Sequence, residues 1–384
     1  MRNSILILIS CIFIGVSPTT LARSRGAVQI MRPNVVVPSV FQRSFIRKDI
    51  ARIEDEIKKQ DGLVNWVNSL KGFQKTLRDK YIKHKKLYPG STAFIGKDNF
   101  IVCIGRSRFL FNTIWQSNIL RNRLKEADKL LYPEAFCSIV QVAKELSYYE
   151  IDLIVIPIPP RAEVYPEKLV TGYNGKPVAP HRVLFIKKLL ESRVETIDLL
   201  PYFLNEKRTD PGYLCLKDDP HWSGKAIRLA AEIIGKRLTR YPFIRDNRGK
   251  VNFTSSTAVI DSYHNLFDSL PDILKKKELR TLKKYNPVFF PDGKAFKSDQ
   301  NSPVLLCGDS YSVAFRGGNL AAHISKEIGM PIDMLVQSGG GPAIPNLLAR
   351  KGKDYLKKKR VIIWAFVARY LPSKNWSNIY FPEN

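Results

Sequence analysis

Short apolar runs of strand length alternate along this chain with amphipathic stretches of helical length. Strands that are buried on both faces of a parallel sheet read as continuous apolar runs, and their alternation with helices implies a mostly parallel sheet between two helical layers. The expected strands are residues 153–157, 194–198, 304–307, 332–336 and 360–366, and the expected helices are residues 133–148, 181–192, 224–238 and 320–329. The sequence therefore predicts an α/β fold with three layers.

The first residues have the pattern of an export signal. A single early basic residue, Arg2, precedes an apolar run at residues 5–16 and a small-residue cleavage site that ends at Ala22. This order is typical of a signal peptide over residues 1–22. The run is shorter than the roughly twenty apolar residues that a membrane-spanning helix needs, although an uncleaved N-terminal anchor is the alternative.

The rest of the chain divides into an extension, a domain and an insertion. Residues 23–90 form a predicted N-terminal extension that is helical from about Ile46, and residues 91–384 form the α/β domain. In the extension, an apolar stripe at helical spacing is expected to pack on the domain: Trp66, Leu70, Phe73 and Leu77. The domain is expected to open with a hairpin of residues 93–95 and 100–104, continued by 108–111, and residues 241–302 read as an irregular insertion over one rim.

The chain is strongly basic, with 62 Lys and Arg residues against 35 Asp and Glu, a formal net charge of +27. The lysines are spread over several clusters, so a generally basic surface is favoured over a nucleic-acid-binding tail, and no nucleic-acid partner is expected. The functional interpretation is attraction to an anionic polysaccharide or an anionic membrane. The alternative is a lysine-rich composition that only decorates solvated faces.

The cysteines predict no zinc site, and no cofactor is expected. After removal of a signal peptide, four remain, namely Cys103, Cys137, Cys215 and Cys307, and four cysteines allow three pairings between which sequence does not choose. Their spacing fits no zinc motif. Cys103 and Cys307 stand in apolar runs, where a buried free thiol is the simpler interpretation.

Ser310 is the candidate nucleophile. It follows the apolar run of residues 304–307 through Gly308-Asp309, so it is expected at a strand-to-helix corner on the carboxyl edge of the sheet, where open α/β sheets place their ligands. The alternative is that Asp309 and Ser310 merely cap a helix.

A second stretch, Asp218-Asp219-Pro220-His221-Trp222-Ser223, supplies the groups that would activate this hydroxyl. A serine needs an imidazole to take its proton, and the imidazole needs a carboxylate to fix its tautomer. Because Pro220 favours an extended segment, Asp219 and His221 are expected on one side of it. The alternative is a surface histidine before a helix that Ser223 caps.

Weaker candidates surround this set. The amide of Tyr311 and the loop containing Gly340 and Gly341 could donate to a developing oxyanion, although a glycine turn that needs positive φ explains the loop equally. Arg369 and Arg161, each after an expected strand, could pair with a substrate carboxylate or acyl group, or could tie down a loop.

At this point the chain resembles the SGNH-hydrolase-like family of alginate O-acetyltransferase proteins, of the AlgJ and AlgX type. The matching motifs are Asp219-Pro220-His221-Trp222 and Gly308-Asp309-Ser310-Tyr311-Ser312. Further similar stretches lie at residues 93–111, 157–169 and 364–371. In the last of these the family's two glutamates are replaced by Ala365 and Ala368, which puts any role of those carboxylates in doubt here.

The resemblance implies a three-layer flavodoxin-like SGNH-hydrolase fold in which the motif order is circularly permuted relative to the usual esterases. It implies an exported, periplasmic polysaccharide O-acetyltransferase that acts through an acyl-serine on an exopolysaccharide such as alginate. A membrane-bound O-acyltransferase would supply the acetyl group, and the chain would be soluble or anchored at the inner membrane by its N-terminus. The alternatives are a carbohydrate acetyl esterase and a non-catalytic polysaccharide-binding or assembly protein.

Overall fold

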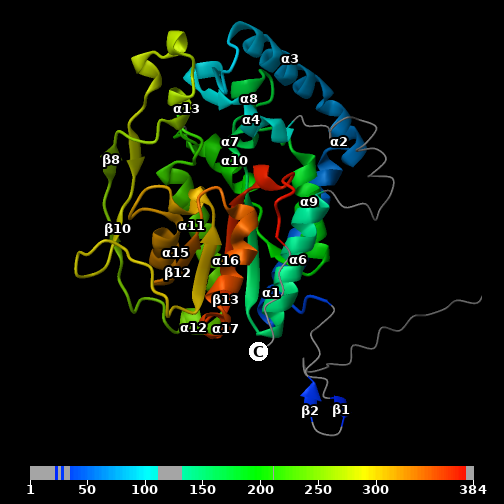
Figure 1. Cartoon of the computed structure of the whole chain (residues 1–384), viewed down its shortest axis with the longest axis vertical. Helices are drawn as coiled ribbons and strands as arrows, with labels where there is room; N and C mark the ends of the chain where they lie inside the picture. Colours follow the sequence, from blue (N-terminus) through cyan, green and yellow to red (C-terminus); the bar gives the residue numbers. More distant parts are fainter. Residues whose placement is uncertain (1–21, 25–26, 30–34, 111–131, 211, 378–384) are drawn as a thin grey trace, which may run out of the picture.

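The computed structural model describes residues 22–24, 27–29, 35–110, 132–210 and 212–377 (Figure 1). Its centre is a parallel sheet of five strands in the order β12-β11-β13-β5-β6. The strands are β5 Asp152–Ile158, β6 Glu195–Thr196, β11 Val304–Gly308, β12 Asp333–Val336 and β13 Val361–Val367. The three middle strands are buried along their whole length, which explains their continuous apolar sequences. The predicted parallel α/β fold is confirmed.

Helices cover both faces of the sheet. Figure 1 shows α1, α6 and α9 on one side and the packed pair α11 and α15 on the other. Their bounds are α1 Val40–Lys59, α6 Pro133–Tyr148, α9 Pro180–Glu191, α11 Gly224–Leu238 and α15 Leu320–Ile328. Local signals set several of these ends, since Ser223 and Asn319 cap α11 and α15 with side-chain hydrogen bonds. The α/β body also contains α10 Leu200–Thr209 and α16 Ile344–Lys351, the latter followed by the short α17 Lys353–Leu356.

The helical part of the N-terminal extension begins earlier than expected and is divided into three helices. Helix α1 starts at Val40 instead of near Ile46, and the expected stripe divides between α2 Leu63–Ser69 and α3 Lys71–Leu87. All four stripe residues are nevertheless buried. Trp66 also donates its indole N–H to the carbonyl of Pro177, 2.9 Å away, so the stripe packs on the α/β body as predicted. The predicted signal peptide lies outside the described residues except for Ala22.

The hairpin at the start of the domain is present, but its expected continuation is not. Strands β3 Ala93–Ile95 and β4 Ile101–Cys103 pair antiparallel. The strand expected at 108–111 is wrong, because α4 Ile104–Ser107 and a short 3-10 helix, Arg108–Leu110, follow β4; Phe111 lies outside the described residues. The Ser107 hydroxyl donates to the carbonyl of Cys103 four residues back, which closes a helical turn at once.

Two very short helices follow β5, namely α7 Arg161–Val164 and α8 Pro166–Leu169. Among the described residues all four cysteines named above are free thiols, with Cys215 and Cys307 buried. In the same part of the chain, no helix combines the length and the apolar character that crossing a bilayer requires.

Residues 241–302 form short elements that are held against the body. They are α12 Pro242–Arg245, β7 Thr254–Ser255, β8 Ala258–Ile260, α13 Asn265–Asp268, the 3-10 turns Asp272–Leu274 (η4) and Lys277–Leu279 (η5), β9 Lys283–Tyr285 and β10 Val288–Phe289. Leu266, Leu270 and Leu279 pack on Ala93 and Ile101 of the hairpin. The insertion thereby bridges the hairpin and helix α11, against which β9 packs.

Candidate active site

Ser310 stands at the corner where β11 ends and the short helix α14 Ser310–Val313 begins. Gly308 is required there, because a Cβ at this position would lie 2.5 Å from the carbonyl oxygen of Ala365. The buried carboxylate of Asp309 accepts the amide hydrogens of Tyr311 and Val367, each at 2.9 Å. These contacts hold the corner against β13 and leave Ser310 partly exposed at the carboxyl edge of the sheet.

The Asp219-Pro220-His221 segment is bent, not extended as its proline suggested. The amide of Leu216 donates to the carbonyl of His221, and the amide of Ser223 donates to that of Leu214, so the chain folds back on itself. The amide of His221 also donates to Oδ1 of Asp219 at 3.0 Å. This turn, rather than one side of an extended strand, brings the carboxylate to the imidazole.

The three side chains form a continuous chain of hydrogen bonds. Asp219 Oδ1 lies 2.6 Å from His221 Nδ1, and His221 Nε2 lies 2.9 Å from Ser310 Oγ. Burial opposes ionisation of Asp219, yet hydrogen bonds from His221 and Asn265 hold the pKa of its carboxyl below the usual range. Because an ionised carboxylate can only accept, Nδ1 carries the ring proton, and Nε2 is free to accept the proton of Ser310.

Asn265 is part of this arrangement, and no sequence signal pointed to it. Its side-chain amide donates to the second oxygen of Asp219, Oδ2, at 2.6 Å, and its backbone amide lies 3.3 Å from the same atom. The residue belongs to the insertion and lies far from Asp219 in the sequence. Each oxygen of the Asp219 carboxylate therefore has its own partner.

The neighbouring Asp218 is the centre of a second buried cluster. Its carboxylate lies 2.7 Å from the ammonium of Lys283 and 2.6 Å from Nδ1 of His264, and it accepts from Thr281. Burial opposes ionisation of Asp218, but the contacts with Lys283, Thr281 and His264 keep the pKa of its carboxyl below normal. This cluster joins the insertion to the loop that carries Asp219 and His221.

Tyr263 of the insertion lies beside the imidazole of His221, and the centroids of the two rings are 6.3 Å apart. Its hydroxyl accepts the amide hydrogen of Phe315 at 3.2 Å. Both Tyr263 and Phe315 have positive φ, 62° and 63°, a strained conformation for aromatic residues that is found preferentially at functional sites.

Two of the three predicted oxyanion donors, the amides of Tyr311 and Gly340, are occupied by other contacts. The amide of Tyr311 is bonded to Asp309, as described above, and the amide of Gly340 donates to the carbonyl of Gln337 at 2.9 Å. Gly341 packs closely, because a Cβ there would lie 2.9 Å from Cβ of Phe366. Contrary to expectation, the Tyr311 and Gly340 amides are not free to bind an oxyanion. The close packing at Gly341 accounts for a glycine at that position.

Tyr311 instead connects the two motifs. Its hydroxyl donates to the carbonyl of Pro220, and its own carbonyl accepts the indole N–H of Trp222 at 2.9 Å. The residues after the serine and around the histidine are thus fastened together, which explains why both motifs carry an aromatic side chain at these positions.

Arg161 holds the triad loop, not an open substrate site. It donates to the backbone carbonyls of Asp219 at 2.9 Å and Lys217 at 3.0 Å, and its guanidinium lies over the ring of Phe100. Burial lowers the pKa of Arg161 to about 10. These contacts favour the second of the two expectations for Arg161, that it ties down a loop.

Arg369 also lies close to the site, and in the described part of the chain it makes fewer hydrogen bonds than Arg161 does. One guanidinium nitrogen donates to the hydroxyl of Tyr370 at 3.3 Å, and the group lies 5.8 Å from the ring centre of Tyr311. With Arg106 and Arg161 it lines a cavity of about 20 Å³, enough for a single water molecule.

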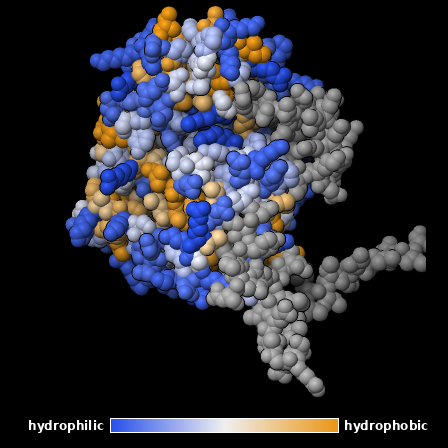
Figure 2. Space-filling model, viewed as in Figure 1, coloured by the Kyte–Doolittle hydropathy of each residue, from blue (hydrophilic) through white to orange (hydrophobic). Residues whose placement is uncertain are grey.

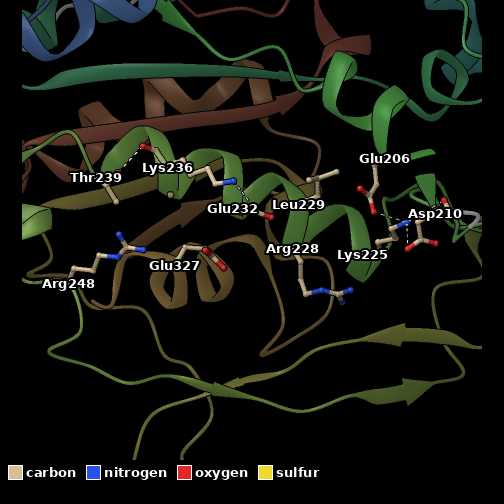
Figure 3. A pocket seen from close by; sticks show the side chains of 11 residues that line it. Glu206, Asp210, Lys225, Arg228, Leu229, Glu232, Lys236, Thr239, Arg248 and Glu327 are labelled. Atoms are coloured by element: carbon tan, nitrogen blue, oxygen red, sulfur yellow. Dashed lines mark hydrogen bonds and ion pairs between the residues drawn. The ribbon is translucent and has the colours of Figure 1, made fainter. Parts of the chain in front are cut away.

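A larger hollow, about 510 Å³, runs along the outer face of α11 (Figure 3). None of Asp219, His221 and Ser310 lines it. Its charges are largely paired, with Lys225 contacting Glu206 and Asp210, and Lys236 contacting Glu232. This hollow is therefore not part of the site formed by Asp219, His221 and Ser310.

The site and the fold define a class of protein. A parallel sheet with a serine after a central strand, hydrogen-bonded to histidine and aspartate from an upstream loop, is an SGNH-hydrolase-like α/β arrangement. The chain belongs to the family described as "SGNH hydrolase-like domain, acetyltransferase AlgX", whose model matches residues 102–368.

Relatives and solved structures agree with this family. The chain is 25% identical over 300 residues to a protein of Pseudomonas putida named "Probable alginate O-acetylase AlgJ", covering 73% of each chain. It is 25% identical over 249 residues to the Azotobacter vinelandii protein of the same name, covering 60% of this chain and 61% of the relative.

Two solved structures share the fold. The O-acetyltransferase domain of Pseudomonas putida AlgJ superposes with a TM-score of 0.56 and 21% identity, covering 74% of this chain and 94% of that one. Pseudomonas aeruginosa AlgX gives a TM-score of 0.54 and 17% identity, covering 75% and 65%. At these identities the likeness shows the fold alone.

Proposed function

We propose that this chain is an exported polysaccharide O-acetyltransferase that passes an acetyl group through an acyl-serine at Ser310 to a sugar hydroxyl. The observation that carries the proposal is the unbroken hydrogen-bond chain from Asp219 through His221 to Ser310. Membership of an acetyltransferase family supports the transfer reaction.

The reaction proceeds in two steps. His221 Nε2 takes the proton of Ser310 as Oγ attacks the acetyl carbonyl, and the imidazolium then gives that proton to the departing donor. In the second step Nε2 takes the proton of a sugar hydroxyl, whose oxygen attacks the acyl-serine, and the proton returns to Ser310 Oγ. Asp219 stabilises the imidazolium in both steps.

The oxyanion needs a donor other than the two amides that are already bonded. The amide of Ser310 is the first of helix α14, and in the described part of the chain it has no hydrogen-bond partner. We assign this amide to the developing oxyanion. A donor on the nucleophile's own residue moves with it and needs no separate positioning.

The proposal also names a class of acceptor, an anionic polysaccharide, and a source of the acetyl group. The relatives are named for alginate, and a formal net charge of +27 suits an anionic polymer. A membrane-bound O-acyltransferase would supply acetyl to the periplasmic side. A signal peptide or anchor at residues 1–22, an extension at 23–90 and a catalytic domain at 91–384 are consistent with that location.

A direct assay tests the reaction. Purified protein is offered an acetyl ester and acidic oligosaccharides, and mass spectrometry measures acetylated sugar. Ser310→Ala and His221→Ala should abolish transfer, whereas Ser338→Ala, which removes an exposed serine from a nearby loop, should not. Unchanged turnover in either triad variant would refute the mechanism. Release of acetate with no sugar acetylation would instead identify an esterase.

A further inference from the structure

Exposed aliphatic side chains gather at one end of the molecule. Of the exposed leucine and isoleucine side chains in the described residues, three lie on the second half of α3 and on the tip of the insertion: Ile82 at 46%, Leu87 at 62% and Ile273 at 79% exposed. Figure 1 shows the C-terminal end of α3 and the yellow-green tip around η4 at the same end. In Figure 2 this end carries orange residues between blue ones.

The two segments line a common hollow. It measures about 520 Å³ and is lined by apolar residues of both, including Leu87 of α3 and Leu274 of the tip, together with Phe94 and Ile95 of the hairpin. Lys83 and Lys97 line it as well. Residues 82–88 and 271–277 are therefore neighbours, and we call them together the tip surface.

The polar side chains of the tip surface are mostly unpaired cations. Lys83, Lys85, Lys86, Lys276 and Lys277 are exposed, and none has an ion pair in the part of the chain that the structure describes. The nearby Lys275 pairs with Asp272 at 2.8 Å. Exposed aliphatic groups among excess lysines are the chemistry by which proteins sit in the headgroup region of an anionic bilayer.

The chain segment that carries the tip of the insertion also contacts the candidate active site. Asn265, which holds Asp219, opens helix α13, and the chain then anchors Leu266 and Leu270 in the hairpin core before it reaches Ile273. In Figure 1 the strands run from the end that carries α17 toward the end that carries α3. A surface bound to the tip would therefore face the carboxyl edge of the sheet.

We propose that the tip surface docks this protein on an anionic phospholipid bilayer. Ile273, Leu87 and Ile82 enter the interface, and the lysines contact lipid phosphates. A saccharide is the less suitable occupant, because Ile273 and Leu87, the most exposed aliphatic side chains of the tip surface, offer a sugar neither a ring to stack on nor a hydrogen-bonding group. The inference stands independently of the reaction proposed above.

Vesicle binding tests the surface with the full chain. The measured quantity is the preference for phosphatidylglycerol vesicles over phosphatidylcholine vesicles, because the apolar run at residues 5–16 would bind both alike. Each lysine near an anionic surface contributes about fivefold in affinity, so Lys83→Gln, Lys86→Gln and Lys276→Gln together should reduce the preference about a hundredfold. The matched control, Lys351→Gln, Lys357→Gln and Lys358→Gln, alters the opposite end by the same charge and should change it little.

A second pair of variants tests the aliphatic part. Ile273→Ser should weaken binding to phosphatidylglycerol vesicles about tenfold, as expected for loss of one buried aliphatic side chain. Val259→Ser removes an exposed aliphatic group elsewhere in the insertion and should have no effect. Equal losses in the two lysine triple variants would overturn the proposal, because binding would then follow net charge alone. Equal losses in Ile273→Ser and Val259→Ser would overturn it as well, because the aliphatic contact would then not lie at the tip surface.

Amide hydrogen exchange localises the contact without mutation. Phosphatidylglycerol vesicles should slow exchange at residues 82–88 and 271–277 and leave residues 254–260 unchanged. No slowing at the tip surface would overturn the proposal. So would slowing there by an acidic oligosaccharide but not by vesicles, which would assign the surface to the polymer.

Discussion

At the level of single residues, Asp219 divides its two carboxylate oxygens between two partners. Oδ1 takes the imidazole of His221 and Oδ2 takes the side-chain amide of Asn265. A carboxylate held at both oxygens cannot rotate away from the ring, so it keeps the histidine in the tautomer that can accept the serine proton. Asn265 is therefore a positioning residue for the triad.

Replacing Asn265 tests this role. Asn265→Ala should reduce acetyl transfer about tenfold, because Asp219 loses the partner on Oδ2 but keeps the one on Oδ1. The pKa of Asp219 should also rise, since one of the hydrogen bonds that lowers it is gone. Carbon-13 NMR titration of the Asp219 carboxyl measures this shift, and labelling of Ser310 by a fluorophosphonate probe measures the loss of rate.

The matched control is Asn252→Ala, an exposed asparagine of the same insertion, which should leave both the labelling rate and the pKa of Asp219 unchanged. A merely structural role for Asn265 would lower the amount of folded protein without raising the pKa of Asp219, and that result would contradict the assignment.

At the level of elements, the loop 215–222 is held from two sides. Arg161 donates to its backbone carbonyls from α7, and Lys283, Thr281 and His264 of the insertion surround Asp218. A loop with no regular secondary structure is thus held rigid by hydrogen bonds and an ion pair from two other elements. Lys283 is buried with Asp218, so removing its ammonium leaves that carboxylate without its cationic partner.

Lys283→Met should reduce the free energy of unfolding by about 3–5 kcal/mol at neutral pH, because it leaves the buried carboxylate of Asp218 without its cationic partner. The pKa of Asp218 is lowered in the folded protein, so its contribution is fully present above its unfolded value and is lost as pH falls through the folded one. The difference between the variant and the unmodified protein should therefore shrink below about pH 4.

Urea unfolding at neutral and acidic pH measures both quantities. Lys284→Met, at the exposed neighbouring position, should change neither. A deficit that is the same at all pH values would show that Lys283 contributes through packing and not through its charge.

At the level of the whole molecule, the insertion packs closely against the α/β body at Gly224. A Cβ on Gly224, the first residue of α11, would lie 2.7 Å from Cα of Tyr285 and 2.9 Å from the carbonyl oxygen of Lys284. Both belong to β9 of the insertion, which also carries Lys283. The distance between α11 and β9 therefore sets where the insertion places its contacts on the triad loop.

Gly224→Ala should push β9 away from α11 and cost about 1–3 kcal/mol of stability, as overpacking commonly does. It should also slow fluorophosphonate labelling of Ser310, because the contacts of the insertion with Asp218 and Asp219 would shift together. Gly105→Ala, where an added Cβ meets nothing within 4 Å, serves as the control in thermal unfolding and labelling. Lost stability with an unchanged labelling rate would show that the insertion does not position the triad.

The sequence by itself determined most of the elements and singled out the candidate reacting groups. Apolar runs and helix caps act between near neighbours in the chain, so β5, β11, β13 and α11 lie within a residue or two of their predicted bounds. The spacing of Asp219 and His221, and the glycine before Asp309-Ser310, are likewise local features.

Only the tertiary structure decided which partners complete the site. Asn265 donates a hydrogen bond to Asp219, and Lys283 forms an ion pair with Asp218. Asp309 accepts the amide hydrogen of Tyr311, and Arg161 donates to the backbone carbonyl of Asp219. Except for the Asp309 contact, these interactions join segments that are far apart in the chain. Such hydrogen bonds depend on how packed elements approach one another, and no periodicity or composition encodes that distance.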